Sequence, residues 1–160
     1  IEGRMKTALY VATVARTYRK AIDDYKKDPA LYQKNMEWYK AEIGKCTYRE
    51  FTTGFYFGKP TTDSQIYDSN TYVKNYTYLG TVEEVREDGC CRIEQKNKFS
   101  VGEQIEIMKP DGRNVLVTVK GITDEDGNAM ESAPHPKQIL WVDLGSEVSP
   151  YDILRRSEME

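Results

Sequence analysis

Residues 47–60 separate two stretches of this 160-residue chain that follow different hydrophobic patterns. They contain a dense group of aromatic residues, together with two glycines and a proline that prevent a long helix. The stretch before them has the period of helices, and the stretch after them has the short apolar runs and turns of β-structure. The sequence therefore predicts an α+β protein in which residues 47–60 connect a helical part to a β part.

Two helices are expected in the first part of the chain. Apolar residues recur every three or four positions over residues 5–27, and the pattern resumes over residues 30–43 after Asp28-Pro29. Pro29 suits the first turn of the second helix, and Gly44 stands where a C-cap glycine belongs. Two such helices cannot bury both apolar stripes against each other alone, so a further surface is needed to cover them.

The second part of the chain predicts a small, mainly antiparallel β-barrel. Turn sequences rich in glycine and aspartate separate short β runs at residues 78–86, 91–95, 104–108, 114–123 and 138–143. Five or six strands within about 80 residues, with no helix needed among them, are typical of a closed or nearly closed barrel. The expected divisions are a helical segment at residues 1–44, a connector at 45–76 and a barrel domain at 77–160.

Composition and charge narrow the class of protein. No apolar run approaches the roughly 18 residues that span a bilayer, and no signal peptide is visible, so we expect a cytoplasmic protein with no membrane partner. Residues 1–80 carry 13 Lys/Arg against 9 Asp/Glu, whereas residues 81–160 carry 10 against 17. Because a β domain that grips nucleic acid is expected to be basic, the helical part is the better candidate for phosphate contacts.

The cysteines and the single histidine form no recognisable catalytic or metal-binding pattern. Cys46, Cys90 and Cys91 lack the spacing of a metal site, and free thiols in a reducing cytoplasm are their expected state. His135 lies between two prolines without a helper nearby, so we expect an exposed loop residue. The chain is therefore expected to contain no catalytic residue, no metal and no cofactor.

Two loops allow a functional interpretation beside a structural one. Residues 124–128 are acidic like a calcium loop, but their glycine stands at the fourth position instead of the sixth, which favours a hairpin turn. Residues 96–103 are expected to form a corner of the barrel, with Phe99 and Val101 pointing the same way. Lys96 and Lys98 at this corner are candidates for a local anion contact.

Four separated stretches resemble the collagenase-like (PrtC-type) peptidases, peptidase family "U thirty-two". They are residues 1–6, two parts of the first helix at 10–12 and 18–23, Arg49 with residues 52–56, and residues 96–102. Their order and spacing hold over essentially the whole chain. The resemblance implies that a larger catalytic domain, expected to be an α/β barrel, precedes this region. It also implies that the terminal barrel is similar to the small barrels of translation elongation factors.

The resemblance also implies a range of activities. Family members are peptidases, and some relatives instead hydroxylate tRNA uridines or quinone precursors with cysteine-bound iron–sulfur clusters. The cluster cysteines belong to the upstream domain, and the cysteines of this chain do not match them. The expected function is a non-catalytic accessory domain of a peptidase-family hydrolase, which presents a macromolecular substrate or docks on its own missing N-terminal catalytic domain.

Two alternatives stay open at this point. One is a tRNA-contacting module of a uridine hydroxylase, with a basic helical face formed by Arg16, Arg19 and Lys20 and with help from Lys96 and Lys98. The other is a fragment with peptidase activity of its own. The substrate, the choice between hydrolase and hydroxylase, and the oligomeric state do not follow from the sequence.

The resemblance and the connector together supply candidate site residues. Glu2, Arg4 and Lys6 are expected in a strand-to-helix loop that faces the missing active site. The aromatic connector is expected to form the docking surface, through Phe51, Thr52, Thr53, Gly54, Phe55, Tyr56 and Phe57.

Overall fold

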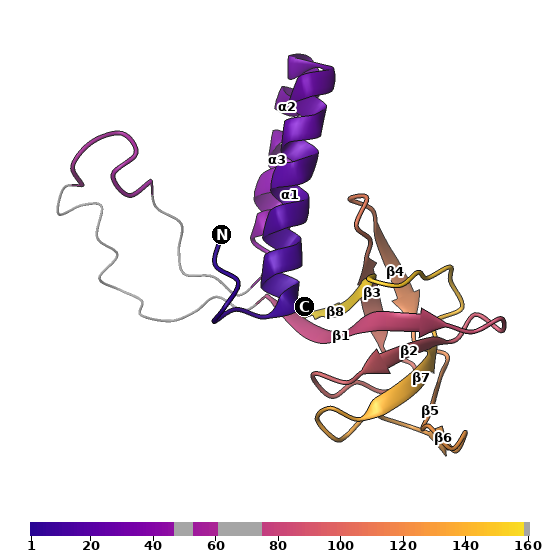
Figure 1. Cartoon of the computed structure of the whole chain (residues 1–160). Coiled ribbons are helices and arrows are strands. Elements are labelled where there is room, and N and C mark those ends of the chain that lie inside the picture. Colours follow the sequence, from indigo (N-terminus) through magenta and orange to yellow (C-terminus); the bar gives the residue numbers. More distant parts are fainter. Residues whose placement is uncertain (47–52, 61–74, 159–160) are drawn as a thin grey trace.

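The computed structural model describes residues 1–46, 53–60 and 75–158. The described residues contain three helices. Figure 1 shows the helices gathered into a column, with a curled antiparallel sheet beside the lower end of that column. The predicted order of helices followed by β-structure is confirmed. Within the described ranges, none of the helices is long and apolar enough to cross a membrane.

Helix α1 (Ala8–Lys27) has a defined start and end. Thr7 caps its start, because the Thr7 hydroxyl accepts a hydrogen bond from the N–H of Tyr10 at 3.3 Å. The N–H of Asp28 donates to the carbonyl of Asp24 at 2.8 Å and closes the last turn. The helix starts later than the predicted residue 5, because the Glu2 carboxylate holds the preceding chain in a turn by accepting from the N–H of Met5.

The second predicted helix is divided at Asn35 into α2 (Pro29–Lys34) and α3 (Met36–Ile43). Asn35 has φ −90° and ψ 4°, and its side-chain amide donates to Oδ2 of Asp24 at 2.9 Å. The break thus coincides with a polar contact that ties the turn to α1. The rings of Tyr32 and Tyr39 stack across the break with centroids 5.6 Å apart.

The sheet contains eight antiparallel strands in the order β4-β3-β8-β1-β2-β7-β5-β6. The strands are β1 (Tyr76–Val85), β2 (Cys91–Glu94), β3 (Gln104–Met108), β4 (Asn114–Thr118), β5 (Gly121–Thr123), β6 (Ala129–Met130), β7 (Ile139–Asp143) and β8 (Ile153–Ser157).

The predicted strand at residues 114–123 is bent into two, and the bend closes the sheet. Its first half, β4, pairs with β3, and its second half, β5, pairs with β7. At the bend, the N–H of Val119 donates to the backbone carbonyl of Glu103 on one side. The N–H of Lys120 donates to the backbone carbonyl of Asp143 on the other side. Since β3 and β7 otherwise stand at opposite sides of the strand order, this segment joins both sides into a small barrel.

The hydrophobic pattern missed two strands, and one of them is central. β8 lies between β3 and β1 and pairs antiparallel with both. Its first three residues are buried, and the third of them is Arg155. This charged residue interrupts the apolar pattern from which a strand would be predicted. The other missed strand, β6, is a two-residue edge paired with β5.

The corner at residues 96–103 has the expected structural role with one correction. Phe99 is fully buried in the barrel core, and Gly102 adopts φ 86° as its N–H donates to the carbonyl of Val119. Val101 does not point the same way as Phe99, because 41% of its surface is exposed. The core that Phe99 joins is contributed by most strands and includes Leu79, Val82, Ile93, Ile105, Ile107, Leu140, Val142 and Leu154.

The acidic loop at residues 124–128 forms a hairpin turn, as predicted. Asp124 accepts hydrogen bonds from the backbone N–H groups of Asp126 and Asn128, and Gly127 takes φ 86°. The Asp124 carboxylate is therefore occupied by its own turn. His135 is an exposed residue in the loop before β7, also as predicted.

Helix α1 packs on the barrel through a small apolar contact. Leu9 of α1 meets Met108 of β3 and Ile153 of β8, with Ala12 and Tyr78 at the edge. Farther along α1, the β3–β4 turn approaches so closely that a Cβ on Gly112 would lie 3.0 Å from Cδ of Lys20. Beside these contacts, polar side chains of the helices and of the barrel meet one another.

Candidate functional site

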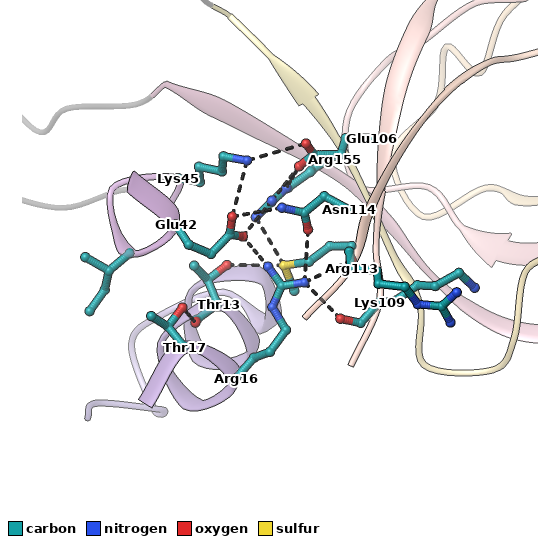
Figure 2. A network of polar contacts seen from close by, with 12 residues as sticks. Thr13, Arg16, Thr17, Glu42, Lys45, Glu106, Lys109, Arg113, Asn114 and Arg155 are labelled. Carbon is teal, nitrogen blue, oxygen red and sulfur yellow. Dashed lines mark hydrogen bonds and ion pairs between the residues drawn. The ribbon is translucent and has the colours of Figure 1, made fainter. Parts of the chain in front are cut away.

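Glu42 of α3 is the centre of a buried ionic network between the helices and the barrel. Figure 2 shows its carboxylate facing Arg16 of α1 and Arg155 of β8, with both of which it forms ion pairs. Nη2 of Arg155 donates to Oε1 of Glu42 at 2.7 Å, and Nδ2 of Asn114 donates to Oε2 at 2.9 Å. Lys45 adds a fourth partner, with Nζ at 3.2 Å from Oε2. We call this set the helix–barrel network.

The two arginines use almost every donor they have. Arg155 is fully buried and donates through Nε to Glu106 at 2.6 Å and through Nη1 to the sulfur of Met108. Arg16 donates through Nη1 to the carbonyl of Lys109 at 2.8 Å and to Oδ1 of Asn114 at 3.0 Å. Each guanidinium therefore bridges separate elements, and the network connects α1 and α3 to β3, β4 and β8.

The network holds charged groups out of water and fixes their protonation. Burial alone would raise the pKa of Glu42, but the nearby charges of Arg155 and Arg16 outweigh it and hold that pKa below its usual value. Burial lowers the pKa of Arg16, although Glu42 opposes the change. The network contains three basic side chains, Arg16, Arg155 and Lys45. They face two acidic ones, Glu42 and Glu106, so the network carries one excess positive charge. The arrangement of paired buried charges is suited to fixing the geometry between the helices and the barrel.

A second buried ion pair fixes the loop between β7 and β8. Nζ of Lys109 lies 2.8 Å from Oδ2 of Asp152, and both side chains are buried. The same oxygen accepts from the N–H of Ser149 at 2.9 Å. Tyr151, next to this anchor, has φ 74° and donates its N–H to the carbonyl of Val82 at 2.8 Å. The loop is therefore tied on both sides of Tyr151.

The predicted substrate-facing residues lie before α1. Glu2 and Arg4 are exposed, and the Glu2 carboxylate accepts from the backbone N–H groups of Arg4 and Met5. The ammonium of Lys6 lies 5.4 Å from the centre of the Tyr10 ring. The three residues thus lie in one short segment, in which Lys6 is half-buried, and their role toward an active site stays a prediction.

Part of the predicted docking surface is described by the structure. Phe51 and Thr52 lie outside the described residues, whereas Thr53 and Gly54 form a turn in which the Thr53 carbonyl accepts from Tyr56. The aromatic side chains that follow are strongly exposed at 78% for Phe55, 85% for Tyr56 and 83% for Phe57. Exposed aromatics are compatible with docking, which stays a prediction.

The two lysines at the barrel corner are arranged differently. Lys96 forms an ion pair with Glu94, and this contact raises the pKa of Lys96 above its usual value. Lys98 is an exposed residue, and its backbone carbonyl accepts a hydrogen bond from Nη1 of Arg156 at 3.2 Å. Part of the charge of Lys96 is therefore already neutralised by Glu94, and an anion contact by either lysine stays a prediction.

The basic helical face expected from Arg16, Arg19 and Lys20 is incorrect for Arg16. Only 7% of Arg16 is exposed, because its guanidinium is drawn into the helix–barrel network. Arg19 remains on the surface beside Asp23, and Lys20 pairs with Asp24. The burial of Arg16 could not be predicted from the sequence, since its partners are far away in the chain.

The three cysteines do not gather into a site. Cys91 is fully buried in the barrel core, where burial raises the pKa of its thiol to about 12. Burial also raises the pKa of Cys46, near the end of α3, and that of Cys90, where Asp88 adds to the effect. Among the described residues, no group of three or more His, Cys, Asp and Glu side chains could hold a metal ion. These thiols do not fit an iron–sulfur cluster.

Sequence comparison assigns the two halves of the chain to related family models. Residues 1–66 match the model for peptidase family U32, and residues 74–155 match the model for the peptidase family U32 C-terminal domain. The chain belongs to peptidase family U32. The resemblance seen in the sequence is thereby confirmed for the family.

Two curated relatives of this U32 chain are named as tRNA hydroxylation proteins. It is 36% identical to the tRNA hydroxylation protein P1 of Bacillus subtilis, in a match that covers 99% of this chain and 37% of the relative. It is 30% identical to the tRNA hydroxylation protein P of Escherichia coli, in a match that covers 98% and 34%. The chain therefore spans about a third of the length of these relatives.

A solved structure from the same family is also similar. It is the C-terminal domain of a protein described as a U32 peptidase of Geobacillus thermoleovorans. The match has 30% sequence identity and a TM-score of 0.46, and it covers 50% of this chain and 99% of the other.

Proposed function

We propose that this U32 chain is a non-catalytic C-terminal region of a tRNA-hydroxylating protein and that it helps to hold the tRNA. The observation that carries the proposal is the pair of tRNA hydroxylation proteins that match it over 98–99% of its length. The proposed divisions are the helical segment 1–44, the connector 45–76 and the barrel 77–160. The macromolecular substrate expected for an accessory domain is then a tRNA and not a protein.

The distribution of charge supports tRNA contact by the helical part. Residues 1–46 carry 10 Lys/Arg against 6 Asp/Glu, a balance of +4, whereas the whole chain has a net charge of −3. Phosphate contacts supply most of the affinity of nonspecific nucleic-acid binding, so a local cationic surface matters more than the net charge. The acidic barrel would favour binding on the helical side of the molecule.

The chemistry of the described side chains supports a non-catalytic role. All three thiols have a pKa above the usual value, so they are poor nucleophiles and poor ligands near neutral pH. In the strongest charged cluster, the helix–barrel network, Glu42 and the two arginines bond mainly to one another and to neighbouring backbone and side-chain groups, although Nε of Arg16 is buried without a hydrogen-bond partner. The catalytic residues of the protein would then lie outside this chain.

Docking on the remainder of the protein is the second part of the proposal. Tyr18, Ile22 and Tyr25 recur on one face of α1 and are 53%, 45% and 56% exposed. We call them the apolar α1 face. The helices match the main U32 model, and about two thirds of the relatives' length lies outside the match. An exposed apolar surface is typical of a protein–protein contact, and the additional residues of a longer protein would cover the apolar α1 face.

Binding of an unmodified tRNA transcript to this chain tests the proposal. We expect binding at low salt, with an affinity that falls as salt rises because counterions are displaced from the phosphates. A duplex DNA of equal charge serves as the control for nonspecific attraction. Absence of binding at low salt would contradict the proposal, and cleavage of gelatin by the pure chain would favour the peptidase alternative instead.

A further inference from the structure

A groove of about 510 Å³ lies between α1 and the barrel, beside the helix–barrel network. Its apolar wall comes from α1, from the end of β3 and from the start of β8. Ligand sites favour such boundaries between parts of a fold, and this volume falls in their usual range. The lining residues are Ala12, Ala15, Arg16, Arg19, Met108, Pro110, Tyr151 and Ile153.

Tyr151 at the edge of this groove is both exposed and strained. Its surface is 79% exposed, and its φ of 74° lies in the left-handed region, which is unfavourable for a non-glycine residue. The strain persists because the Tyr151 N–H is bonded to Val82 and because Asp152 is anchored by Lys109. An exposed ring that gains little from packing is thus held in place at a cost to stability. Such local strain often accompanies a binding function.

We propose that this groove takes an unpaired nucleobase of RNA, with the base against the ring of Tyr151 and a neighbouring phosphate at Arg19. The inference rests on the proposed function, in that the RNA would be the tRNA. Stacking of a base on an aromatic side chain is tolerant of sequence, so the site would contribute affinity more than base specificity.

The charge of the groove fits this occupant. Among the residues that the structure describes, the two charged residues that line it are both arginines, and no carboxylate lines it. Arg16 is committed to Glu42, which leaves Arg19 as the residue that can turn to a phosphate. The partner of Arg19 is Asp23, one turn along the helix, and both side chains are about 60% exposed. Exposed pairs of this kind are weak, so a phosphate can replace Asp23 at little cost.

The test uses the whole chain, a fluorescent ten-nucleotide oligouridylate, the abasic oligomer with the same phosphates, and an unmodified tRNA transcript. Tyr151→Gly removes the ring and also relieves the backbone strain, so the variant should be at least as stable as the parent. We expect it to bind oligouridylate about tenfold more weakly, whereas Tyr151→Phe should remain within about twofold. The abasic oligomer should not distinguish Tyr151→Gly from the parent chain.

Lys137→Gly is the matched control. Within the described part of the chain, Lys137 is the other non-glycine residue with positive φ, at 64°, and it is exposed in the loop before β7, away from the groove. The Lys137→Gly variant should relieve the same kind of backbone strain as Tyr151→Gly and should leave RNA binding unchanged. Arg19→Gln should weaken binding to every oligomer and reduce the salt dependence by about one phosphate contact.

The outcomes separate this inference from the proposed function. If Tyr151→Gly binds tRNA and oligouridylate as tightly as the parent, the groove is not a base site, although tRNA binding itself would stand. If the parent binds neither RNA at low salt, both proposals fail. Concentration-dependent dimerisation that Tyr151→Gly abolishes would show that a second copy of the chain fills the groove, and would overturn the inference.

Discussion

Glu42 and Arg155 are 113 positions apart in the chain, and the guanidinium of Arg155 donates to Oε1 of Glu42 at 2.7 Å where neither side chain meets water. This contact joins the last part of the helical region to a central strand of the barrel. Because Arg16 shares the same carboxylate, the position of α1 on the barrel depends on one buried charge.

Replacing Glu42 should therefore destabilise the chain strongly. Glu42→Ala leaves two buried guanidiniums with Glu106 as their remaining acidic partner in the network, and such a loss costs about 3–5 kcal/mol. Glu42→Gln keeps the shape and some hydrogen bonds, so we expect the lower end of that range. The free energy of unfolding from urea denaturation measures both. Glu37→Gln, on the exposed side of α3, is the control and should change stability by less than about 0.5 kcal/mol. A similar small effect at Glu42 would contradict the network's structural role.

The lowered pKa of Glu42 predicts a loss of stability in acid. Since the pKa is lower in the folded chain than its ordinary value of 4.5, the stabilisation is complete above about pH 4.5 and is lost as the pH falls through the folded pKa. The difference in unfolding free energy between the parent chain and Glu42→Gln should therefore shrink below pH 4.5. Comparing the two cancels the titration of other carboxylates. A difference that stays constant down to pH 2 would refute the assignment.

Tyr39 and Asp24 predict a loss of stability at high pH. The hydroxyl of Tyr39 donates to Oδ2 of Asp24 at 2.6 Å, and burial together with Asp24 raises the pKa of Tyr39 to about 12. A raised folded pKa means that the stabilisation is complete below about pH 10 and is lost as the pH rises through 12. Tyr39→Phe should cost about 1–3 kcal/mol at neutral pH and should abolish this alkaline loss. Tyr56→Phe, at an exposed position, is the control for both measurements.

The sequence predicted the elements whose residues follow a local period. Helix α1, the strand at Gln104–Met108 and the hairpin after β5 could be found because their apolar spacing and turn residues are local. The break at Asn35 could not, because it coincides with a hydrogen bond to Asp24 on another helix. The bend between β4 and β5 also depends on partners, since β3 and β7 pair with different halves of one run.

The missed strand and the misplaced arginine have the same physical cause. Arg155 interrupts the apolar run of β8, and the sequence pattern places Arg16 on a charged helix surface, yet both are buried. Each is tolerated because the Glu42 carboxylate, which comes from a distant part of the chain, forms an ion pair with it. A charged residue in an otherwise apolar segment was the available signal, but its partner could not be named without the fold.

The cysteines should differ sharply in reactivity. Cys91 is fully buried with a pKa of about 12, so at pH 8 only about one molecule in ten thousand carries its thiolate. Cys90 is half-exposed and should react first with a small alkylating reagent, whereas Cys46 and Cys91 should react on unfolding. Mass spectrometry of the native Cys90→Ser chain should then show almost no labelling, and its unfolded form should take two labels. Rapid labelling of native Cys90→Ser would show that β2 or the end of α3 opens locally.

The apolar α1 face predicts an effect that depends on the length of the protein. In this chain alone, Ile22→Asp exchanges a side chain at a half-exposed position, so the unfolding free energy should change by about 0.5 kcal/mol or less. In the full-length natural protein, the same change would place a charge in the proposed docking surface. The cost there should be several-fold larger, because a buried charge without a partner is expensive. Thermal unfolding of both lengths measures the contrast, with Lys26→Asp as the control for added negative charge near the end of the same helix. Equal effects of Ile22→Asp in the two proteins would show that this face of α1 remains open to water.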